Sequence, residues 1–402
     1  SIVEIPLQNA QIYGQFGQVE KGIENLLYLQ HIKPNHVPVG IALARLYVQA
    51  GDFDSANQIV NNLETSRVIW RKQIAQIQGD IASFQYDFIS AKIHYQKSLT
   101  YGPTLHDRNR LGITLIALGN LNEASEQLKN ATEELGFKSP PGKVPIPLVS
   151  LPAKIIQAFR FNPFLMSQLI EAKSEIGDDS LMALGQIIAQ DPNYLGANLV
   201  LVQELRRHRV FEEIRENLLN TETPLSSIPK RIVQYWDNPI PPVEIQSLNQ
   251  TWKEQNPAYE YQRFSYQDAI DFIVQHYNDD ERVLKAFQNC EQPAAQADFF
   301  RLAYLNKMGG FYADADDRCR KSLDILHEGN PELVILQEDF ACIGNNFMGS
   351  IPGQTTVRIA LYQALQNLLY YCADGPWFQT GPGLLTCALG NTLLPYLSYD
   401  DY

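Results

Sequence analysis

The stretch QADFFRLAYLNKMGGFYADADD, residues 296–317, decides the fold of the C-terminal half of the chain. Its first part predicts a helix in which Asp298 and Arg301 are three residues apart and therefore share a face. A glycine pair at 309–310 ends that helix, and the apolar segment 311–313 predicts a short strand. Acidic residues follow directly. Because ligands of open α/β sheets bind at the carboxyl ends of strands, this stretch predicts a ligand site.

The acidic residues Asp314 and Asp316 are two apart, so in an extended chain their side chains point to one side. Two convergent carboxylates repel each other unless a cation lies between them, and oxygen ligands suit Mg²⁺ or Mn²⁺. The alternative is a solvated acidic turn after a strand, because Asp-x-Asp is a common triplet. The helix, the glycine pair and the strand that precede this triplet favour a metal site.

Outward from this stretch, short apolar segments alternate with helical patterns. Strands are predicted at 231–236, 259–264 and 333–336, and helices at about 266–288 and 293–308. Strands that alternate with helices are typical of an α/β domain with a largely parallel sheet.

The first third of the chain carries an internal repeat. Gly17, Gly51 and Gly119 lie 34 and 68 residues apart, and each stands between two amphipathic stretches. A small residue follows five positions later, where the two helices of a hairpin approach closely. The grid point near Gln85 lacks its glycine. A 34-residue period of this kind resembles the tetratricopeptide repeat and predicts all-α helix pairs over 1–136.

Two proline-rich segments divide the rest of the chain. Residues 137–152 contain Pro-Pro-Gly and Pro-x-Pro, which fit neither a helix nor a central strand, so we expect a semi-extended connector. Further repeat-like helices are predicted over 153–222, among them a pair at 181–190 and 197–207 joined by Asp-Pro-Asn. The α/β domain is expected over 228–402.

The composition limits the class of protein. Among 402 residues, 32 Lys and Arg stand against 45 Asp and Glu, which gives a formal net charge of −13. A nucleic-acid binder needs a basic footprint, so this balance argues against that class. No uninterrupted apolar run reaches about 18 residues, so no membrane span is expected. The five cysteines show no CxxC spacing and are expected to be free thiols.

Five ordered blocks over about 228–390 resemble glycosyltransferase family 32. The central block is Ala-x-x-x-Asp-x-x-Arg followed by Gly-Gly-x-Tyr-x-Asp-x-Asp. The others are Ile-Pro-Lys-x-Ile at 228–232 with Trp236, Trp252 with Asn-Pro-x-Tyr-Glu-Tyr at 256–261, Asn-x-Phe-x at 345–348, and Thr-Gly-Pro at 380–382. The resemblance implies a GT-A (Rossmann-like) fold and a retaining, DXD-type hexosyltransferase. Its donor would be a UDP- or GDP-sugar, and its cofactor Mn²⁺ or Mg²⁺.

The resemblance also implies roles at the donor site. Trp236 would stack on the nucleotide base. Asp298 and Arg301 would hold the hydroxyl groups of the donor sugar and the ribose. Tyr312 would line the nucleotide pocket, and Asp314 would contact the ribose or the sugar.

The metal would be bound directly by Asp316, with Asp314 as a second ligand. Its charge would stabilise the diphosphate leaving group. Attack on the face that the leaving group vacates needs no protein nucleophile, so no catalytic residue is assigned. Further candidate site residues, each with a solvated or structural alternative, are Asp317, Glu338, Asp339, Asn346 and Thr380.

Departures from the family pattern leave alternatives open. Gln234 stands where the family commonly has His, and Ala297 where it commonly has Ser. Relatives usually carry a C-terminal segment that adds a metal ligand, and no counterpart is recognised before Tyr402, so a truncated domain, a divergent enzyme and an inactive homologue all stay open. The first hypothesis is a metal-dependent glycosyltransferase acting on a glycan or protein acceptor. The alternative is a catalytically silent repeat scaffold.

The surroundings of the protein are also predicted. Repeat arrays present concave surfaces suited to peptides, so a protein partner on the helical repeats is expected. Because no anchor is visible, we expect a bacterial cytoplasmic location or the periphery of a membrane assembly. The first hypothesis places the protein in polysaccharide biosynthesis.

Overall fold

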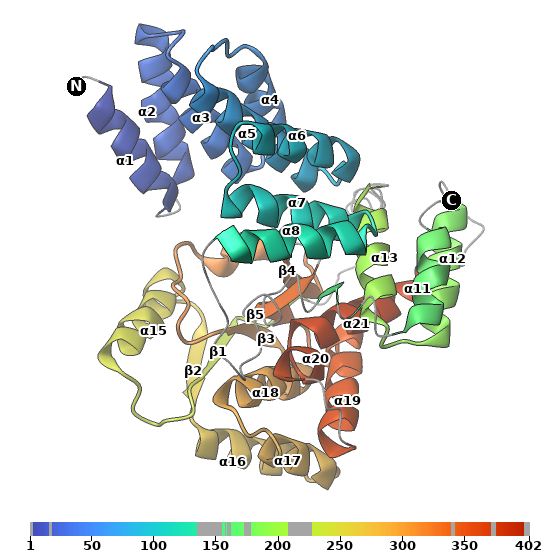
Figure 1. Cartoon of the computed structure of the whole chain (residues 1–402). Coiled ribbons are helices and arrows are strands. Elements are labelled where there is room, and N and C mark those ends of the chain that lie inside the picture. Colours follow the sequence, from blue (N-terminus) through green and yellow to red (C-terminus); the bar gives the residue numbers. More distant parts are fainter. Residues whose placement is uncertain are drawn as a thin grey trace. The chain divides into compact units, whose positions relative to one another are not determined.

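The computed structural model describes residues 3–15, 18–134, 155–156, 158, 162–172, 178–207, 227–338, 342–370 and 375–397. The chain divides into two compact units, residues 1–160 and 161–402 (Figure 1). Among the described residues, the first unit contains helices, and the second combines helices with one five-stranded sheet. The predicted combination of an all-α part with an α/β domain is therefore confirmed.

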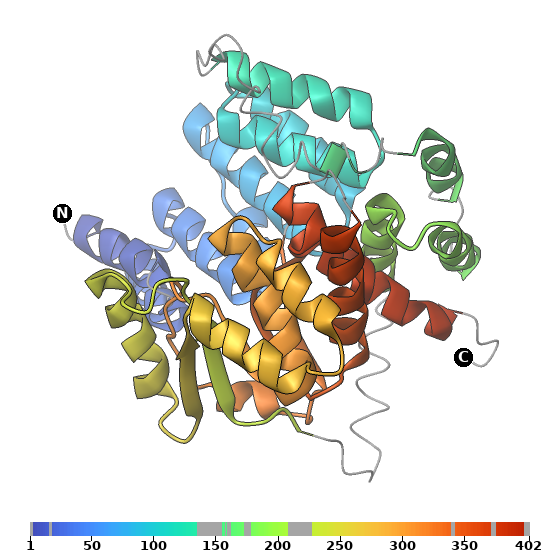
Figure 2. The ribbon, with the colours of Figure 1, turned by 90° about the horizontal axis from the view of Figure 1, so that it is seen from below.

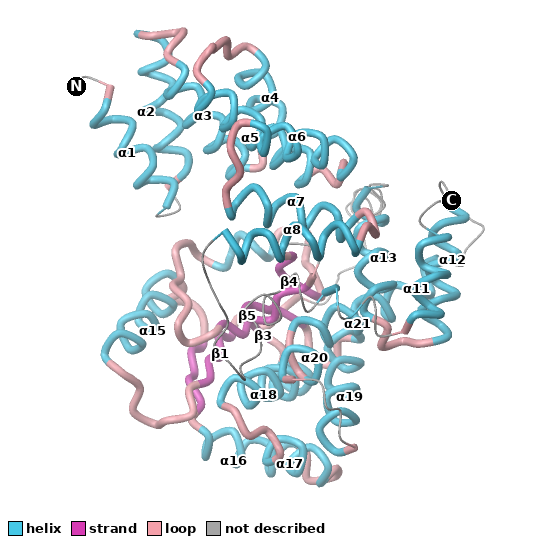
Figure 3. Tube along the Cα trace, in the orientation of Figure 1, coloured by secondary structure: helices cyan, strands magenta, loops and turns pink. Residues whose placement is uncertain are grey.

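The first unit is built from helix hairpins, in which consecutive helices pack as pairs (Figure 3). The pairs are α1 (Glu4–Gln15) with α2 (Val19–Ile32), α3 (Val37–Ala50) with α4 (Phe53–Asn61), α5 (Val68–Phe84) with α6 (Phe88–Thr100), and α7 (Leu105–Ala117) with α8 (Leu121–Glu134). Gly51 and Gly119 turn the chain with positive φ angles of 78° and 76°. Where the repeat lacks its glycine, Tyr86 takes a positive φ of 61°.

The small residues of the repeat lie where the helices of a hairpin meet. Ala56, Ala91 and Ala124 are all fully buried. Gly17 and the predicted connector at 137–152 lie outside the described residues. The helix pairs are present, and the specific likeness to tetratricopeptide repeats stays a prediction.

A buried carboxylate joins three helices of this unit. Asp107 of α7 is fully buried and accepts hydrogen bonds from Gln76 Nε2 of α5 and Ser98 Oγ of α6, both at 2.7 Å. Its other oxygen pairs with Lys72 Nζ of α5 at 2.8 Å. Burial alone would raise the pKa of Asp107, but hydrogen bonds from Lys72, Thr104, Gln76 and Ser98 lower it to about 2.

The described helices that precede the sheet in the second unit are α11 (Pro163–Ala172), α12 (Asp178–Gln190) and α13 (Leu195–Arg207). The helix pair predicted from the Asp-Pro-Asn turn is therefore present. Helix α13 packs along α21 (Pro382–Leu393) so closely that a Cβ at Gly390 would lie 2.0 Å from Asn198 Oδ1. Asn391 Nδ2 also donates to the carbonyl of Pro192 at 2.8 Å. Segments before and after the sheet thus form one packed layer.

The sheet has the strand order β2-β1-β3-β5-β4. Its strands are β1 (Arg231–Tyr235), β2 (Glu260–Phe264), β3 (Gly310–Ala313), β4 (Leu333–Gln337) and β5 (Ile343–Ser350). Strand β1 pairs parallel with both β2 and β3, whereas β5 pairs antiparallel with both β3 and β4.

The prediction of a largely parallel sheet is wrong, because the sheet is mixed. The difference lies in β5, whose sequence IGNNFMGS has no alternation of apolar and polar residues and is rich in glycine and asparagine, which are depleted in strands. The helix predicted over 266–288 is two helices, α16 (Tyr266–His276) and α17 (Glu281–Gln288). Asp280 caps α17 by accepting a hydrogen bond from the backbone of Arg282.

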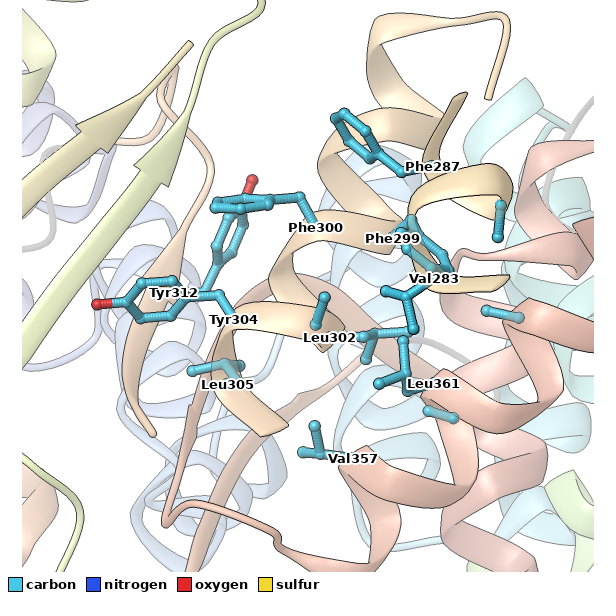
Figure 4. Packing of buried hydrophobic residues seen from close by; sticks show 14 of the residues in the cluster. Val283, Phe287, Phe299, Phe300, Leu302, Tyr304, Leu305, Tyr312, Val357 and Leu361 are labelled. Atoms are coloured by element: carbon cyan, nitrogen blue, oxygen red, sulfur yellow. The ribbon is translucent and has the colours of Figure 1, made fainter. Parts of the chain in front are cut away.

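Adjacent residues of strands β1 and β3 belong to two separate hydrophobic cores. Val233 and Tyr312 join the larger core, together with the aromatic face of α18 (Pro293–Met308) and with α19 (Thr355–Leu369) (Figure 4). Ile232 and Phe311, one residue earlier in each strand, join a smaller core with Trp252 of α15 (Val243–Gln255). Figure 2 shows α16, α17 and α18 alongside the strands. The short helices η1 (Leu323–His327), α20 (Pro376–Gln379) and η3 (Leu394–Leu397) complete the unit.

Candidate active site

The candidate site lies where β3 ends, beside α18 and the first half of β5. Its centre is Arg301, whose side chain is 2% exposed. Arg301 Nη2 lies 3.0 Å from Asp298 Oδ1 and 2.9 Å from Asp314 Oδ1. The structure therefore brings together the helix residues and the first Asp-x-Asp carboxylate that the sequence singled out.

The other two nitrogens of this guanidinium also donate hydrogen bonds. Arg301 Nε donates to the carbonyl of Ala297, and Nη1 donates to the carbonyl of Asn345. The guanidinium carbon lies 4.4 Å from the centre of the buried Tyr312 ring, and Tyr312 Oη donates to Asp314 Oδ1 at 3.2 Å. Each nitrogen of the Arg301 guanidinium thus contacts at least one protein oxygen, and Arg301 orients two carboxylates.

Two further polar side chains also hold Asp298. Asn345 Nδ2 donates to Oδ1 at 2.8 Å, and Thr380 Oγ1 donates to Oδ2 at 3.3 Å. Thr380 was predicted as a site residue, and its buried position beside Asp298 agrees with a place in this cluster. Asn345 was missed, although it opens the Asn-x-Phe block, because only its neighbour Asn346 was taken as a candidate.

Burial makes both inner carboxylates harder to ionise. Burial, with the neighbouring Asp298 and Asp316 charges, outweighs Arg301 and raises the pKa of Asp314 to about 6. Burial likewise raises the pKa of Asp298, although Arg301, Asn345 and Thr380 favour its charged form. Perturbed carboxylates of this kind cluster at functional sites.

Residues 314–317 form a turn, called the Asp-x-Asp turn below. Its closing hydrogen bond runs from the N–H of Asp317 to the carbonyl of Asp314 at 3.1 Å. Gln234 Nε2 donates to that same carbonyl at 2.9 Å, so this side chain helps to fix the start of the turn. Asn346 Nδ2 donates to the Asp317 carboxylate at 3.0 Å. The carboxylate of Asp316, in contrast, is exposed.

Other predicted residues lie outside this network. Trp236 follows β1 and is half-buried, and its backbone N–H donates to the carbonyl of Phe264 at 3.0 Å. Glu338 is exposed at the end of β4, and its side chain lies over Gly344 of β5. Asp339 lies outside the described residues.

The donor set suits a hard cation. The hydrogen bonds from Arg301 and Tyr312 to the Asp314 side chain both end on Oδ1, and Asp316 is exposed, so these two residues offer oxygen ligands. Within the described ranges, no group of three or more His, Cys, Asp or Glu side chains is placed to hold a metal ion. Asp314 and Asp316 would therefore fit a metal ion that a bound diphosphate also helps to hold.

The segment around the Asp-x-Asp turn also matches a known protein family. Residues 242–338 match the family described as glycosyltransferase sugar-binding region containing DXD motif. This stretch therefore resembles the DXD-containing sugar-binding region of glycosyltransferases. It includes α15, α18, β3 and the Asp-x-Asp turn, whereas Asn345 and Thr380 lie beyond its end.

Proteins similar to part of this chain are found in yeasts. Mannosyl phosphorylinositol ceramide synthase SUR1 of Saccharomyces cerevisiae is 30% identical over 171 residues, which is 42% of each chain. Inositol phosphoceramide mannosyltransferase 2 of Schizosaccharomyces pombe is 28% identical over 36% of this chain and 40% of its own length. The chain thus spans about two fifths of the length of these relatives. The solved structure of PaToxG glycosyltransferase has 18% identity and a TM-score of 0.36, covering 46% of this chain and 76% of its own.

These relatives overturn the expectation of a bacterial cytoplasmic location, because they come from yeasts. The expectation rested on a missing anchor, which says nothing about compartment. Among the described helices, none combines the length and the apolar character that a membrane span requires.

Proposed function

We propose that the protein is a metal-dependent, retaining glycosyltransferase that transfers a hexose from a nucleotide-diphosphate sugar to a glycan, lipid-linked or protein hydroxyl. The names of the yeast relatives favour mannose as the hexose and an inositol-bearing lipid as the acceptor class. The observation that carries the proposal is the buried Arg301, which fixes two carboxylates beside an exposed third one.

The three carboxylates differ in exposure, and this order suggests their roles. The side chain of Asp298 is 14% exposed and that of Asp314 is 30% exposed, while Asp316 is open to solvent. Asp298 would accept hydrogen bonds from hydroxyl groups of the donor sugar. Asp314 would contact the ribose or the sugar and share the metal with Asp316. Arg301 acts through both inner carboxylates, and Trp236 would stack on the base.

A divalent cation, when bound by Asp314 and Asp316, supplies Lewis-acid stabilisation of the diphosphate leaving group. The protein's own contribution is positioning. Arg301 and Tyr312 fix the direction of Asp314, while Asn345 and Thr380 fix that of Asp298. Groups that are already oriented need no rearrangement when charge develops in the transition state.

The test is nucleotide release from a panel of UDP- and GDP-linked hexoses, GDP-mannose included, with Mn²⁺ and the full chain. We expect release from one donor, lost with EDTA and in Asp316→Asn. The matched control is Asp271→Asn on the surface of α16, which should leave release unchanged. If no donor is hydrolysed and none binds with Mn²⁺, the catalytically silent scaffold becomes the better account.

A further inference from the structure

Helix α15 holds the Asp-x-Asp turn from outside. Asn249 Nδ2 donates to the carbonyl of Ala315 at 3.0 Å, and Trp252 Nε1 donates to the carbonyl of Asp317 at 2.9 Å. Asn249 is 6% exposed and Trp252 is 5% exposed, so water does not compete freely for these hydrogen bonds. The two carbonyls lie one residue before and one residue after Asp316. The backbone is therefore fixed on both sides of that residue.

The helix is itself fixed against the sheet. The ring of Trp252 stacks on Phe347 of β5 with centroids 6.0 Å apart and planes at 20°. Thr251 Oγ1 accepts a hydrogen bond from the N–H of Cys319 at 3.0 Å, which extends the contact beyond the turn. The direction of the indole N–H is thus set by packing that does not involve the turn.

We propose that Asn249 and Trp252 are positioning residues that hold the Asp-x-Asp turn in the conformation in which Asp316 binds the metal–diphosphate group. This inference rests on the proposed function. Within the described part of the chain, the Asp316 carboxylate has no hydrogen-bond or ion-pair partner, so its direction depends on the backbone that carries it. Neither Asn249 nor Trp252 touches the donor in this account.

The physical reason is preorganisation. A turn that samples several conformations presents the carboxylate in several directions, and metal binding must then select one of them. Two buried hydrogen bonds from one rigid helix remove this freedom before the metal arrives. The sequence separation of more than 60 residues between helix and turn means that only the fold brings these partners together.

The experiment measures Mn²⁺ binding by electron paramagnetic resonance, with GDP present, in the full chain and in Trp252→Phe and Asn249→Leu. Phenylalanine keeps an aromatic ring against Phe347 but removes the N–H donor. Each variant should weaken Mn²⁺ binding by about 3- to 10-fold, the effect of one hydrogen bond. The matched control is Gln250→Leu, on the exposed face of the same helix, where the amide donates to Glu254.

A second readout separates positioning from structural damage. Saturating Mn²⁺ should restore nucleotide release by Trp252→Phe to within about twofold of the unchanged chain, because only the metal-binding step is impaired. Should Trp252→Phe lower the melting temperature, Thr251→Val compared with Thr251→Ser tests the neighbouring hydrogen bond of the same helix, which the N–H of Cys319 donates, and leaves the Trp252 ring in place. Mn²⁺ affinities equal to that of the unchanged chain in folded variants would overturn the positioning role. No Mn²⁺ binding by the unchanged chain would overturn the proposed function itself.

Discussion

At the scale of single residues, the site depends on charge balance in a buried place. Arg301 faces two carboxylates that burial already makes difficult to ionise. Removing one member of a buried group of charges leaves the remaining charges without a partner. This destabilises the protein by more than the complete ion pair stabilises it. Replacing Arg301 should therefore have a structural effect that a stability measurement can detect.

Arg301→Met should lower the free energy of unfolding by about 3–5 kcal/mol, because Asp298 and Asp314 lose their shared cation. The measurement is chemical denaturation of the full chain. Lys307→Met, on the exposed side of the same helix, should change stability by less than about 0.5 kcal/mol. Equal effects of the two variants would contradict the account of a buried charge centre.

At the scale of elements, the link between α18 and β3 places the site. Gly309 and Gly310 have φ angles of 62° and 102°, which reverse the chain so that β3 returns beside β1. A Cβ at Gly310 would lie 2.9 Å from Arg231 Cβ and 3.0 Å from its carbonyl oxygen. The glycine pair thus does more than end a helix, since it allows the close approach of two neighbouring strands.

Gly310→Ala should destabilise the second unit by about 1–3 kcal/mol, through backbone strain and the collision with β1. It should also reduce nucleotide release, because displacement of β3 moves Asp314. Thermal unfolding and donor hydrolysis measure the two effects. Gly375→Ala is the control, since nothing lies within 4 Å of its Cβ and its φ is −53°. If Gly375→Ala lowered stability and nucleotide release as much as Gly310→Ala, this explanation would be wrong.

The Asp107 cluster predicts an acid sensitivity of the helical unit. The pKa of Asp107 is lowered to about 2 from a model-compound value of 3.8. A carboxyl group whose pKa is lowered on folding stabilises the protein at pH values above its pKa in the unfolded chain. This contribution is lost as the pH falls from about 4 to about 2.

Asp107→Asn should therefore lower the free energy of unfolding by about 2 kcal/mol at pH 7. The difference in stability from the unchanged chain should shrink below pH 4. The measurement is urea unfolding of the full chain as a function of pH. Glu64→Gln, an exposed carboxylate between two helices, serves as the control. A difference that persists undiminished at pH 2 would show that charge on Asp107 is not the cause.

At the scale of the whole molecule, segments far apart in sequence form one layer. Helix α13 lies before the sheet and α21 after it, yet Gly390 approaches Asn198 without room for a Cβ. Asn198 Nδ2 in turn donates to the carbonyls of Pro192 and Tyr194. The helices before the sheet are therefore part of the structural support of the second unit.

A double-mutant cycle tests this packing. Gly390→Ala should destabilise the second unit by about 1–3 kcal/mol through overpacking. In the Asn198→Ala background the same change should cost much less, because the colliding side chain is gone. Chemical denaturation of the four proteins gives the coupling. Strict additivity would mean that the two helices do not meet as described.

Much of this organisation follows from local sequence. The 34-residue period with its glycine turns predicted helix pairs, since helix ends and close approach impose their own residue preferences. The segment 296–317 predicted a helix, a break, a strand and an acidic turn, because each depends on a few adjacent residues. Asp298 and Arg301 were placed on one face for the same reason. The family resemblance added the remaining site candidates.

Tertiary structure alone decided the rest. Strand β5 lacks a period-two pattern, so only pairing with β3 and β4 makes it a strand and the sheet mixed. The bridge from Arg301 to Asp314, the place of Asn345, and the hold of Asn249 and Trp252 on the turn join residues from separate elements. Such contacts depend on how the elements pack. Packing energy is a sum over the whole core, so no single segment of sequence determines it.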